Sequence, residues 1–306
     1  MELLLEQLLN AVLLGCVYTL VAVGFSLFFG VVNVVVFCGG DIAAFGAFSV
    51  LLFYLVFSVT GFLTSFPAWL FVLIIVICGA ALGSLFGKAA YTVSIKPYEK
   101  KSELMPLLST IALGILVREL IGLLYPQGRN PQVFPSLLPS GTIIEGSALT
   151  VSNLMIIVIT VGILGALFLL INKTKLGWAM QTLSQDKETA SMIGINIKRV
   201  INFTFVLGGA ILGVGGFLIG SYYGIVRFDM GASYGLIGFS AAVVGGLGNI
   251  YGAIVGGMLL SFVEVFISGY IPGGTAYARI FSFLIVVIFM IFRPEGILGQ
   301  KTVEKV

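Results

Sequence analysis

Residues 8–30 of the chain read LLNAVLLGCVYTLVAVGFSLFFG, an apolar run without a charged side chain. A helix needs about 20 such residues to cross the roughly 30 Å hydrocarbon core of a bilayer. Further apolar runs of this kind lie at 41–58, 67–90, 104–124, 149–171, 200–224, 235–268 and 276–292. The pattern predicts an all-α, polytopic transmembrane helix bundle with about eight to nine membrane segments, some of them short or broken.

The composition excludes several classes of protein. Hydrophobic residues make up 59% of the 306 residues and charged residues only 9%, against about 25% charged in a soluble domain. Such a chain could not cover a soluble core, and it is too apolar for a disordered protein. The chain has no His, which excludes Ser-His triads and His metal sites, and Cys16, Cys38 and Cys78 lack metal-ligand spacing. We therefore expect a polytopic membrane protein, and we assign it no catalytic residues, metal or cofactor of its own; an intramembrane enzyme that uses paired carboxylates would need acids close together.

Basic residues indicate the orientation of the chain, because Lys and Arg concentrate in cytoplasmic loops. The lysines fall in three regions, with Lys88, Lys96, Lys100 and Lys101 in the first, Lys173, Lys175, Lys187 and Lys198 in the second, and Lys301 and Lys305 in the third. The other loops carry the single arginines Arg129, Arg227 and Arg279. The N-terminus is thus predicted outside and the C-terminus in the cytoplasm, which requires an odd number of crossings.

The apolar stretch 235–268 leaves the number of crossings open. It is interrupted at residues 245–249, GGLGN, and again at Gly252, so each piece has roughly 12 to 18 residues. Two short helices that cross would give nine crossings, and a re-entrant pair would give seven; we favour nine. No soluble domain fits between the runs, so residues 1–306 are expected to form a single transmembrane domain.

The predicted cytoplasmic loop 172–199 is the most informative polar stretch. Ser184 is suited to cap a short helix, with Asp186 and Glu188 in its first turn. Gly194 is suited to end that helix and Asn196 to cap the next membrane helix. On the residues alone the loop is better interpreted as a solvated connector, and a docking helix for a cytoplasmic partner is the alternative.

Glycines recur every four residues at several places, including Gly79, Gly83 and Gly87, and Gly209 and Gly213. Small residues at this spacing let membrane helices approach closely, so close helix packing is the main interpretation. The glycine-rich breaks at Gly39-Gly40 and at 245–252 differ, because they free backbone groups that only protein or a water-filled cavity can satisfy. Breaks of this type often line transport pathways.

Four ionisable residues, Asp41, Arg118, Glu119 and Glu264, fall at membrane depth, where a charge requires a partner or an aqueous path. Arg118 and Glu119 are neighbours and cannot face one another on a helix, so each needs another partner. Asp41 stands at a predicted helix start, where capping is as plausible a role as transport. For Glu264, transport and structural hydrogen bonding are equally supported.

Two other functions are unsupported. The segment GSLFGK at 83–88 has three residues between its glycines and is followed by Ala89, so it does not fit a phosphate-binding loop. The net charge of +3 is too small to indicate a nucleic-acid partner.

Residues 188–194, ETASMIG, resemble the E-A-A-x-x-x-G coupling-loop motif of ABC importer permeases. The surrounding residues 186–218 are similar to the branched-chain amino acid permease family of the LivH type. So are 17–48, 220–231, 239–266 and the tail 293–306, so the resemblance runs along nearly the whole chain. Thr189 replaces the second Ala of the motif, and Cys38-Gly39-Gly40 stands where the family has A-H-G. The missing His leaves open whether the substrate is a branched-chain amino acid.

The resemblance implies the permease subunit of an ATP-driven importer in a bacterial or archaeal cytoplasmic (inner) membrane. Its implied partners are a homologous second permease subunit, two cytoplasmic ABC ATPase subunits that bind ATP and Mg, and an extracytoplasmic substrate-binding protein, all acting at the lipid bilayer. The implied ATPase-coupling residues are Asp186, Glu188, Thr189, Ala190, Met192, Ile193 and Gly194.

The candidates for the translocation pathway are Asn33, Phe37, Gly39, Gly40, Asp41, Gly245, Gly246, Gly248, Asn249 and Glu264. Two alternative functions remain. The solute could be another small polar molecule, such as urea, an amide, a sugar or a nucleoside. The chain could also be an ion-coupled secondary transporter, which would need carboxylates such as Glu264 in mid-membrane.

Overall fold

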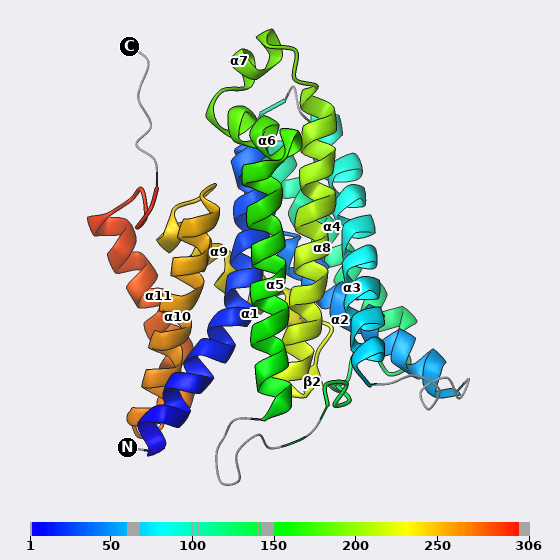
Figure 1. The fold of residues 1–306 in the computed structure, drawn as a ribbon, viewed down its shortest axis with the longest axis vertical. Coiled ribbons are helices and arrows are strands. Elements are labelled where there is room, and N and C mark those ends of the chain that lie inside the picture. Colours follow the sequence, from blue (N-terminus) through cyan, green and yellow to red (C-terminus); the bar gives the residue numbers. More distant parts are fainter. Residues whose placement is uncertain are drawn as a thin grey trace.

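The computed structural model describes residues 2–59, 68–98, 101–102, 104–139, 141 and 150–299. Figure 1 shows a bundle of long helices with two short helices at one end. The bundle helices are α1 (Glu2–Val32), α2 (Gly39–Val59), α3 (Ala68–Ala90), α4 (Leu104–Leu124), α5 (Val151–Lys173), α8 (Ile197–Tyr223), α9 (Met230–Gly245), α10 (Ile250–Tyr270) and α11 (Gly274–Phe292). In the described residues eight of them are long and apolar enough to cross a membrane, and α9 is shorter. The predicted all-α membrane bundle is confirmed.

The shorter elements connect the bundle helices. At one end, α3 continues into a π-helical turn (Tyr91–Ile95) and a 3-10 turn (Lys96–Tyr98), and α5 is followed by α6 (Lys175–Gln185) and α7 (Lys187–Met192). At the other end, β1 (Gln132–Val133) pairs antiparallel with β2 (Ile225–Val226). The β pair joins the segment after α4 to the segment after α8.

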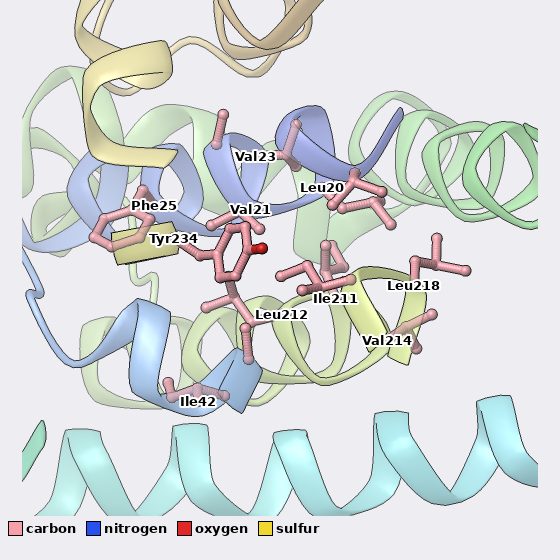
Figure 2. Packing of buried hydrophobic residues seen from close by; sticks show 14 of the residues in the cluster. Leu20, Val21, Val23, Phe25, Ile42, Ile211, Leu212, Val214, Leu218 and Tyr234 are labelled. Carbon is pink, nitrogen blue, oxygen red and sulfur yellow. The ribbon is translucent and has the colours of Figure 1, made fainter. Parts of the chain in front are cut away.

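Helices α1 and α8 form the core of the bundle. Helix α8 packs against α1, α2 and α3, and α1 also packs against α9 and α10. The rings of Phe28 in α1 and Phe205 in α8 stack with centroids 4.5 Å apart. Figure 2 shows side chains of α1, such as Leu20 and Val21, facing Ile211 and Leu212 of α8. Neighbouring helices surround most of both helices, and α1 is apolar on all faces.

Glycines set the distance between α3 and α8. A Cβ atom on Gly83 would clash with the carbonyl oxygen of Gly209, and one on Gly213 would clash with that of Gly79. The two backbones therefore touch directly, which gives close packing in a medium that provides no hydrophobic force between helices. The predicted role of this glycine spacing is confirmed.

The interrupted stretch 235–268 forms two helices, α9 and α10, joined by a turn at 246–249. Gly246 and Gly248 have φ of +112° and +85°, which side chains with a Cβ rarely adopt. The Asn249 side chain then caps α10 by accepting from the amides of Tyr251 and Gly252 at 3.0 and 3.3 Å. The helices have 16 and 21 residues. The predicted second interruption at Gly252 is wrong, because Gly252 lies inside α10 just after the Asn249 cap, and α10 is therefore longer than predicted.

The two ends of the bundle differ in charge and composition. Figure 1 places the N-terminus of α1 at the end opposite α6 and α7, whereas α11 finishes at the α6–α7 end. The described lysines lie in the connections at the α6–α7 end, or next to them, as the sequence predicts; Lys100, Lys301 and Lys305 lie outside the described residues. Arg279 differs from its prediction, because it lies within α11 and not in a loop.

Replacing Gly83 with Leu is expected to destabilise the bundle, because the side chain would push α3 away from the Gly209 carbonyl. Overpacking of this kind costs about 1–3 kcal/mol or more. Gly165→Leu in α5 is the matched control, since a Cβ there meets nothing within 4 Å. Size-exclusion chromatography of heated detergent extracts measures the difference. Equal thermal stability of the two variants would contradict direct backbone packing of α3 and α8.

Candidate coupling and translocation sites

The polar connection after α5 folds into an elbow made of α6 and α7. Asp186 separates the two helices and caps α7, because its Oδ1 accepts the amides of Glu188 and Thr189 at 2.9 and 3.4 Å. Its Oδ2 also accepts the Thr189 hydroxyl at 2.8 Å. The prediction that Ser184 caps the helix is wrong. Helix α6 continues to Gln185, and the Ser184 hydroxyl donates to the Gln181 carbonyl within it.

The end of α7 confirms two sequence predictions. Gly194 has φ of +82° and donates its amide to the Ser191 carbonyl at 3.1 Å. The Ile195 amide donates a hydrogen bond to the Ala190 carbonyl, also at 3.1 Å. This is the usual glycine-dependent termination of a helix. The side chain of Asn196 then accepts the Arg199 amide and caps α8.

The motif residues of the elbow divide into anchoring and exposed groups. Ala190 is fully buried, so it fixes α7 against the rest of the chain. Met192 is 85% and Ile193 63% exposed, and Glu188 is exposed beside them. These two large apolar side chains, at the end of α7 and directly after it, form a small exposed apolar surface suited to a protein partner.

The elbow is joined to the end of α1 by Lys187, which sequence reasoning did not single out. Its Nζ donates to the Val32 carbonyl at 2.9 Å. The next residue, Asn33, has φ of +58°, and there the chain leaves α1. A lysine beside the motif was the only signal in the sequence, since the acceptor is a backbone carbonyl 155 residues away.

After Asn33 the chain turns back into the bundle. The Phe37 amide donates to the Thr110 hydroxyl of α4 at 3.3 Å, and its ring lies 5.7 Å from that of Phe239 in α9. Helix α2 begins two residues later, where a Cβ on Gly40 would clash with the backbone of Gly231. The Gly39-Gly40 break thus lets α2 begin against the start of α9.

Asp41 and Arg118 form an ion pair where α2, α4 and α9 meet. The Arg118 guanidinium donates to both carboxylate oxygens of Asp41, at 3.0 and 3.2 Å. The carboxylate occupies the space that a Cβ on Gly114 or Gly231 would fill. Gly114 is ten residues from either end of α4, about 15 Å along the helix. The pair therefore lies halfway along a membrane-spanning helix.

The other acidic candidates have separate partners. As predicted, Arg118 and Glu119 do not pair with one another. Glu119 instead accepts a hydrogen bond from the Arg129 guanidinium at 3.2 Å, on the surface. Asp41 is the third residue of α2 and pairs with Arg118, so the suggested capping role is wrong. Glu264 in α10 accepts the Tyr18 hydroxyl of α1 at 2.7 Å.

The second candidate break, 245–249, lies away from Asp41. Gly235 in α9 contacts Gly40, and Gly245 is ten residues further along that helix. The break contacts the C-terminal segment, since the Leu298 amide donates to the Gly245 carbonyl at 2.9 Å and Asn249 donates to the Leu298 carbonyl at 2.7 Å. A Cβ on Gly246 would meet Gly299. Gly248 packs on Gly30 near the end of α1.

These features define a class of protein. A bundle of membrane-spanning helices has a helix start and an ion pair at half depth, and an exposed polar elbow tied to its central helix. Within the described ranges, no cluster of Cys, Asp and Glu could hold a metal ion. Discontinuous helices and intramembrane charges at half depth are features of membrane transporters.

The chain belongs to the family described as branched-chain amino acid transport system permease component, which matches residues 7–290. It is 31% identical to the high-affinity branched-chain amino acid transport system permease protein LivH of Salmonella typhimurium, over 99% of the chain and 97% of that protein. It is also 31% identical to the permease protein BraD of Pseudomonas aeruginosa, over 99% of the chain and 98% of that protein. It is 28% identical to the probable branched-chain amino acid transport permease protein LivH of Methanocaldococcus jannaschii, over 69% of the chain and 64% of that protein. No solved structure matches the chain significantly.

Replacing Arg118 with Gln is expected to destabilise the bundle, because it leaves the Asp41 carboxylate buried without its counter-charge. The loss should approach about 3 kcal/mol, less than for a fully buried pair because the Arg118 side chain is 23% exposed. The double variant Asp41→Asn/Arg118→Gln should recover most of the loss. Thermal stability in detergent measures both.

Arg129→Gln is the matched control, because Arg129 and Glu119 are 64% and 51% exposed and such pairs contribute less than about 1 kcal/mol. If Arg118→Gln lowers thermal stability no more than Arg129→Gln does, the pair does not hold α2 to α4. The same conclusion follows if the double variant is no more stable than Arg118→Gln.

Proposed function

We propose that the chain is the membrane-spanning permease subunit of an ATP-driven importer for branched-chain or related amino acids. The observation that carries the proposal is the elbow: the ETASMIG residues lie on an exposed helix that is hydrogen-bonded to the end of the central helix α1. Family membership and two relatives named as branched-chain amino acid transport permeases support the substrate class.

The proposed assembly has four kinds of subunit. Residues 1–306 act as one permease domain and pair with a homologous second permease subunit. Two cytoplasmic ABC ATPase subunits bind ATP and Mg and dock at the α6–α7 end, and an extracytoplasmic binding protein delivers the solute at the other end. In this arrangement the protein lies in a bacterial or archaeal cytoplasmic membrane, with its N-terminus outside and its C-terminus in the cytoplasm. The lysines at the α6–α7 end support that orientation.

Docking would use the exposed side of α7. Met192 and Ile193 supply apolar contact, and Glu188 supplies charge at the positive N-terminal end of the helix. Asp186, Thr189, Ala190 and Gly194 hold the shape of the elbow through the cap, the buried methyl group and the left-handed turn.

Movement of the elbow would be transmitted along the chain to the start of α2, which lies at half the depth of the membrane. A displacement of α7 acts on the Val32 carbonyl through Lys187, at the point where Asn33 redirects the chain. Five residues beyond Asn33 the chain reaches Cys38, followed by Gly39, Gly40 and the Asp41–Arg118 pair. Closure of the ATPases would thus bias the start of α2 between two positions and open the bundle alternately to either side. Asn33, Phe37, Gly39, Gly40 and Asp41 are the proposed pathway residues on this route.

The sites at 245–249 and at Glu264 complete the proposed pathway. Gly245, Gly246, Gly248 and Asn249 would border its cytoplasmic exit, since they lie at the same end as the elbow. Glu264 would belong to its opposite half.

Copurification and uptake test the proposed function. The full-length chain, solubilised with its native membrane partners, should copurify with an ABC ATPase and a second permease. Proteoliposomes that contain this complex should take up leucine with the binding protein and ATP present. Uptake that survives ATP removal while an ion gradient is maintained would instead support an ion-coupled carrier. Uptake of urea, an amide, a sugar or a nucleoside without leucine uptake would show that the substrate class is wrong.

Gly194→Asp is expected to uncouple transport. Its φ of +82° is unfavourable for a side chain, at a cost of about 1–2 kcal/mol, and the new carboxylate would enter the docking surface beside Met192 and Ile193. ATPase copurification and leucine uptake should both fall. Gly273→Asp at the opposite end is the matched control, with φ of +74° and equally open surroundings. Equal ATPase recovery and uptake for the two variants would refute docking at α7.

A further inference from the structure

An apolar groove lies between α3 and α5, with α8 as its floor. Its volume is about 250 Å³, and all of its lining side chains are aliphatic. Leu167, Ile211 and Val214 are buried within it, whereas Ile77 and Ala166 are exposed at its rim. Helix α3 packs closely on α8, but α5 packs mainly on α1 and α6. The groove therefore separates α5 from the α3–α8 pair.

The groove extends from the middle of the bundle toward the α6–α7 end. On α8 its lining runs from Leu207 to Val214, in the middle of that helix, and on α5 from Ile163 to Leu170, in the second half. Seven residues of helix span about 10 Å, which is two thirds of the roughly 15 Å depth of one leaflet. A groove at this depth contacts the acyl chains of the leaflet on the α6–α7 side.

Three basic residues lie at the α6–α7 end of the helices that line the groove: Lys88 of α3, Lys173 of α5 and Arg199 of α8. All three are exposed, and within the described ranges none of them takes part in a salt bridge. Lys173 lies about 5 Å along its helix from the nearest lining residue, and the other two lie about 12 Å away along theirs. Long basic side chains extend over such distances to reach the headgroup layer.

Helical periodicity places Lys88 and Lys173 on the groove side of their helices. Lys88 follows the rim residue Ile77 by eleven residues, and Lys173 follows the rim residue Ala166 by seven. Seven and eleven residues are close to two and three turns of an α-helix. Each lysine therefore lies in line with an exposed residue of the groove rim.

Arg199 and its neighbour Lys198 differ in their position around α8. Arg199 precedes the lining residue Ala210 by eleven residues, about three turns, so the two share one side of the helix. Lys198 precedes the lining residue Leu207 by nine residues, about two and a half turns, and so lies on the opposite side. The chain thus offers one basic residue above the groove beside another that is turned away from it.

We propose that this groove binds an anionic phospholipid of the cytoplasmic leaflet, with one acyl chain in the groove and the phosphate at Lys88, Lys173 and Arg199. Basic pockets between membrane helices on the cytoplasmic side are suited to acidic headgroups. The aliphatic lining supplies dispersion contacts along the chain. The lipid holds α5, which leads into the elbow, against the α3–α8 pair. The inference adds a partner to the proposed function and rests only on its orientation.

Charge favours a lipid in the groove over a helix of the second permease subunit. Two homologous subunits related by an axis along the membrane normal meet with their cytoplasmic ends together. Because basic residues concentrate at the cytoplasmic end of each subunit, a partner helix in the groove would bring like charges toward Lys88, Lys173 and Arg199. An anionic phosphate compensates these charges.

Lipid binding to the complex purified from its native membrane tests the proposal. Dioleoylphosphatidylglycerol is titrated against neutral dioleoylphosphatidylcholine, and native mass spectrometry counts the bound molecules. The unaltered complex should bind phosphatidylglycerol preferentially. Arg199→Gln should weaken that binding about fivefold, the contribution of one basic residue near a lipid surface, and Lys88→Gln/Lys173→Gln/Arg199→Gln about a hundredfold.

Lys198→Gln is the matched control for charge and should leave phosphatidylglycerol binding unchanged. Equal binding of the two lipids by the unaltered complex would overturn the proposal. So would an equal loss in Arg199→Gln and Lys198→Gln, because it would show a general attraction to the basic end of the bundle. All the replaced side chains are exposed, so their loss removes no core packing.

A second pair of variants tests the groove itself. Ala166→Phe places a ring at the rim and should displace the acyl chain, so that phosphatidylglycerol binding falls although all three basic residues remain. Gly165→Phe is its control, because Gly165 does not line the groove and a Cβ there meets nothing within 4 Å. Equal binding by the two variants would refute the groove as the site. Loss of the second permease subunit from Ala166→Phe alone would show a subunit interface instead, and would also overturn the proposal.

Lipid binding is measured without transport, so the two proposals fail separately. If the complex takes up leucine but binds the two lipids equally, the proposed function stands and the lipid site is refuted. If it binds phosphatidylglycerol selectively through Arg199 but takes up no amino acid, the lipid site stands and the proposed function is wrong.

Discussion

Every backbone amide and carbonyl at membrane depth must find a partner inside the protein, and the rest of this structure depends on that constraint. Helix α2 begins halfway along the bundle, so its first amides and the preceding residues are far from either water layer. The protein accommodates them by packing Gly40 on Gly231 and by bonding the Phe37 amide to Thr110. The break is stable because α4 and α9 enclose it.

Glycine makes this enclosure possible. Gly114 and Gly231 leave the space that the Asp41 carboxylate occupies, and Arg118 then compensates its charge. The same absence of side chains lets α3 and α8 touch at Gly83 and Gly209. A rigid α1–α8 core results, against which the start of α2 and the elbow are positioned. In the proposed transport cycle, such a packed core would confine movement to the connection between α1 and α2.

The sequence predicted elements well and contacts poorly. The helix positions, the break at 245–249, the cap at Asn196 and the left-handed Gly194 follow from local rules of hydropathy and backbone conformation. Arg118 was recognised as needing a partner, but Asp41 is 77 residues away and no local rule joins them. Ser184 was mistaken for a cap because α6, which Thr174 caps, extends through Ser184 to Gln185, so the cap of the next short helix falls on Asp186.

The sequence by itself therefore determined that the chain is a membrane bundle of the permease type, which residues form its membrane helices, and where the polar loop with its short helix lies. These properties depend on the order of apolar, polar and glycine residues along the chain. The tertiary structure alone decided that α2 begins at half depth, that Lys187 joins the elbow to α1, and that Tyr18 of α1 bonds Glu264 of α10. Those pairings bring together distant segments, and their geometry depends on how the helices pack.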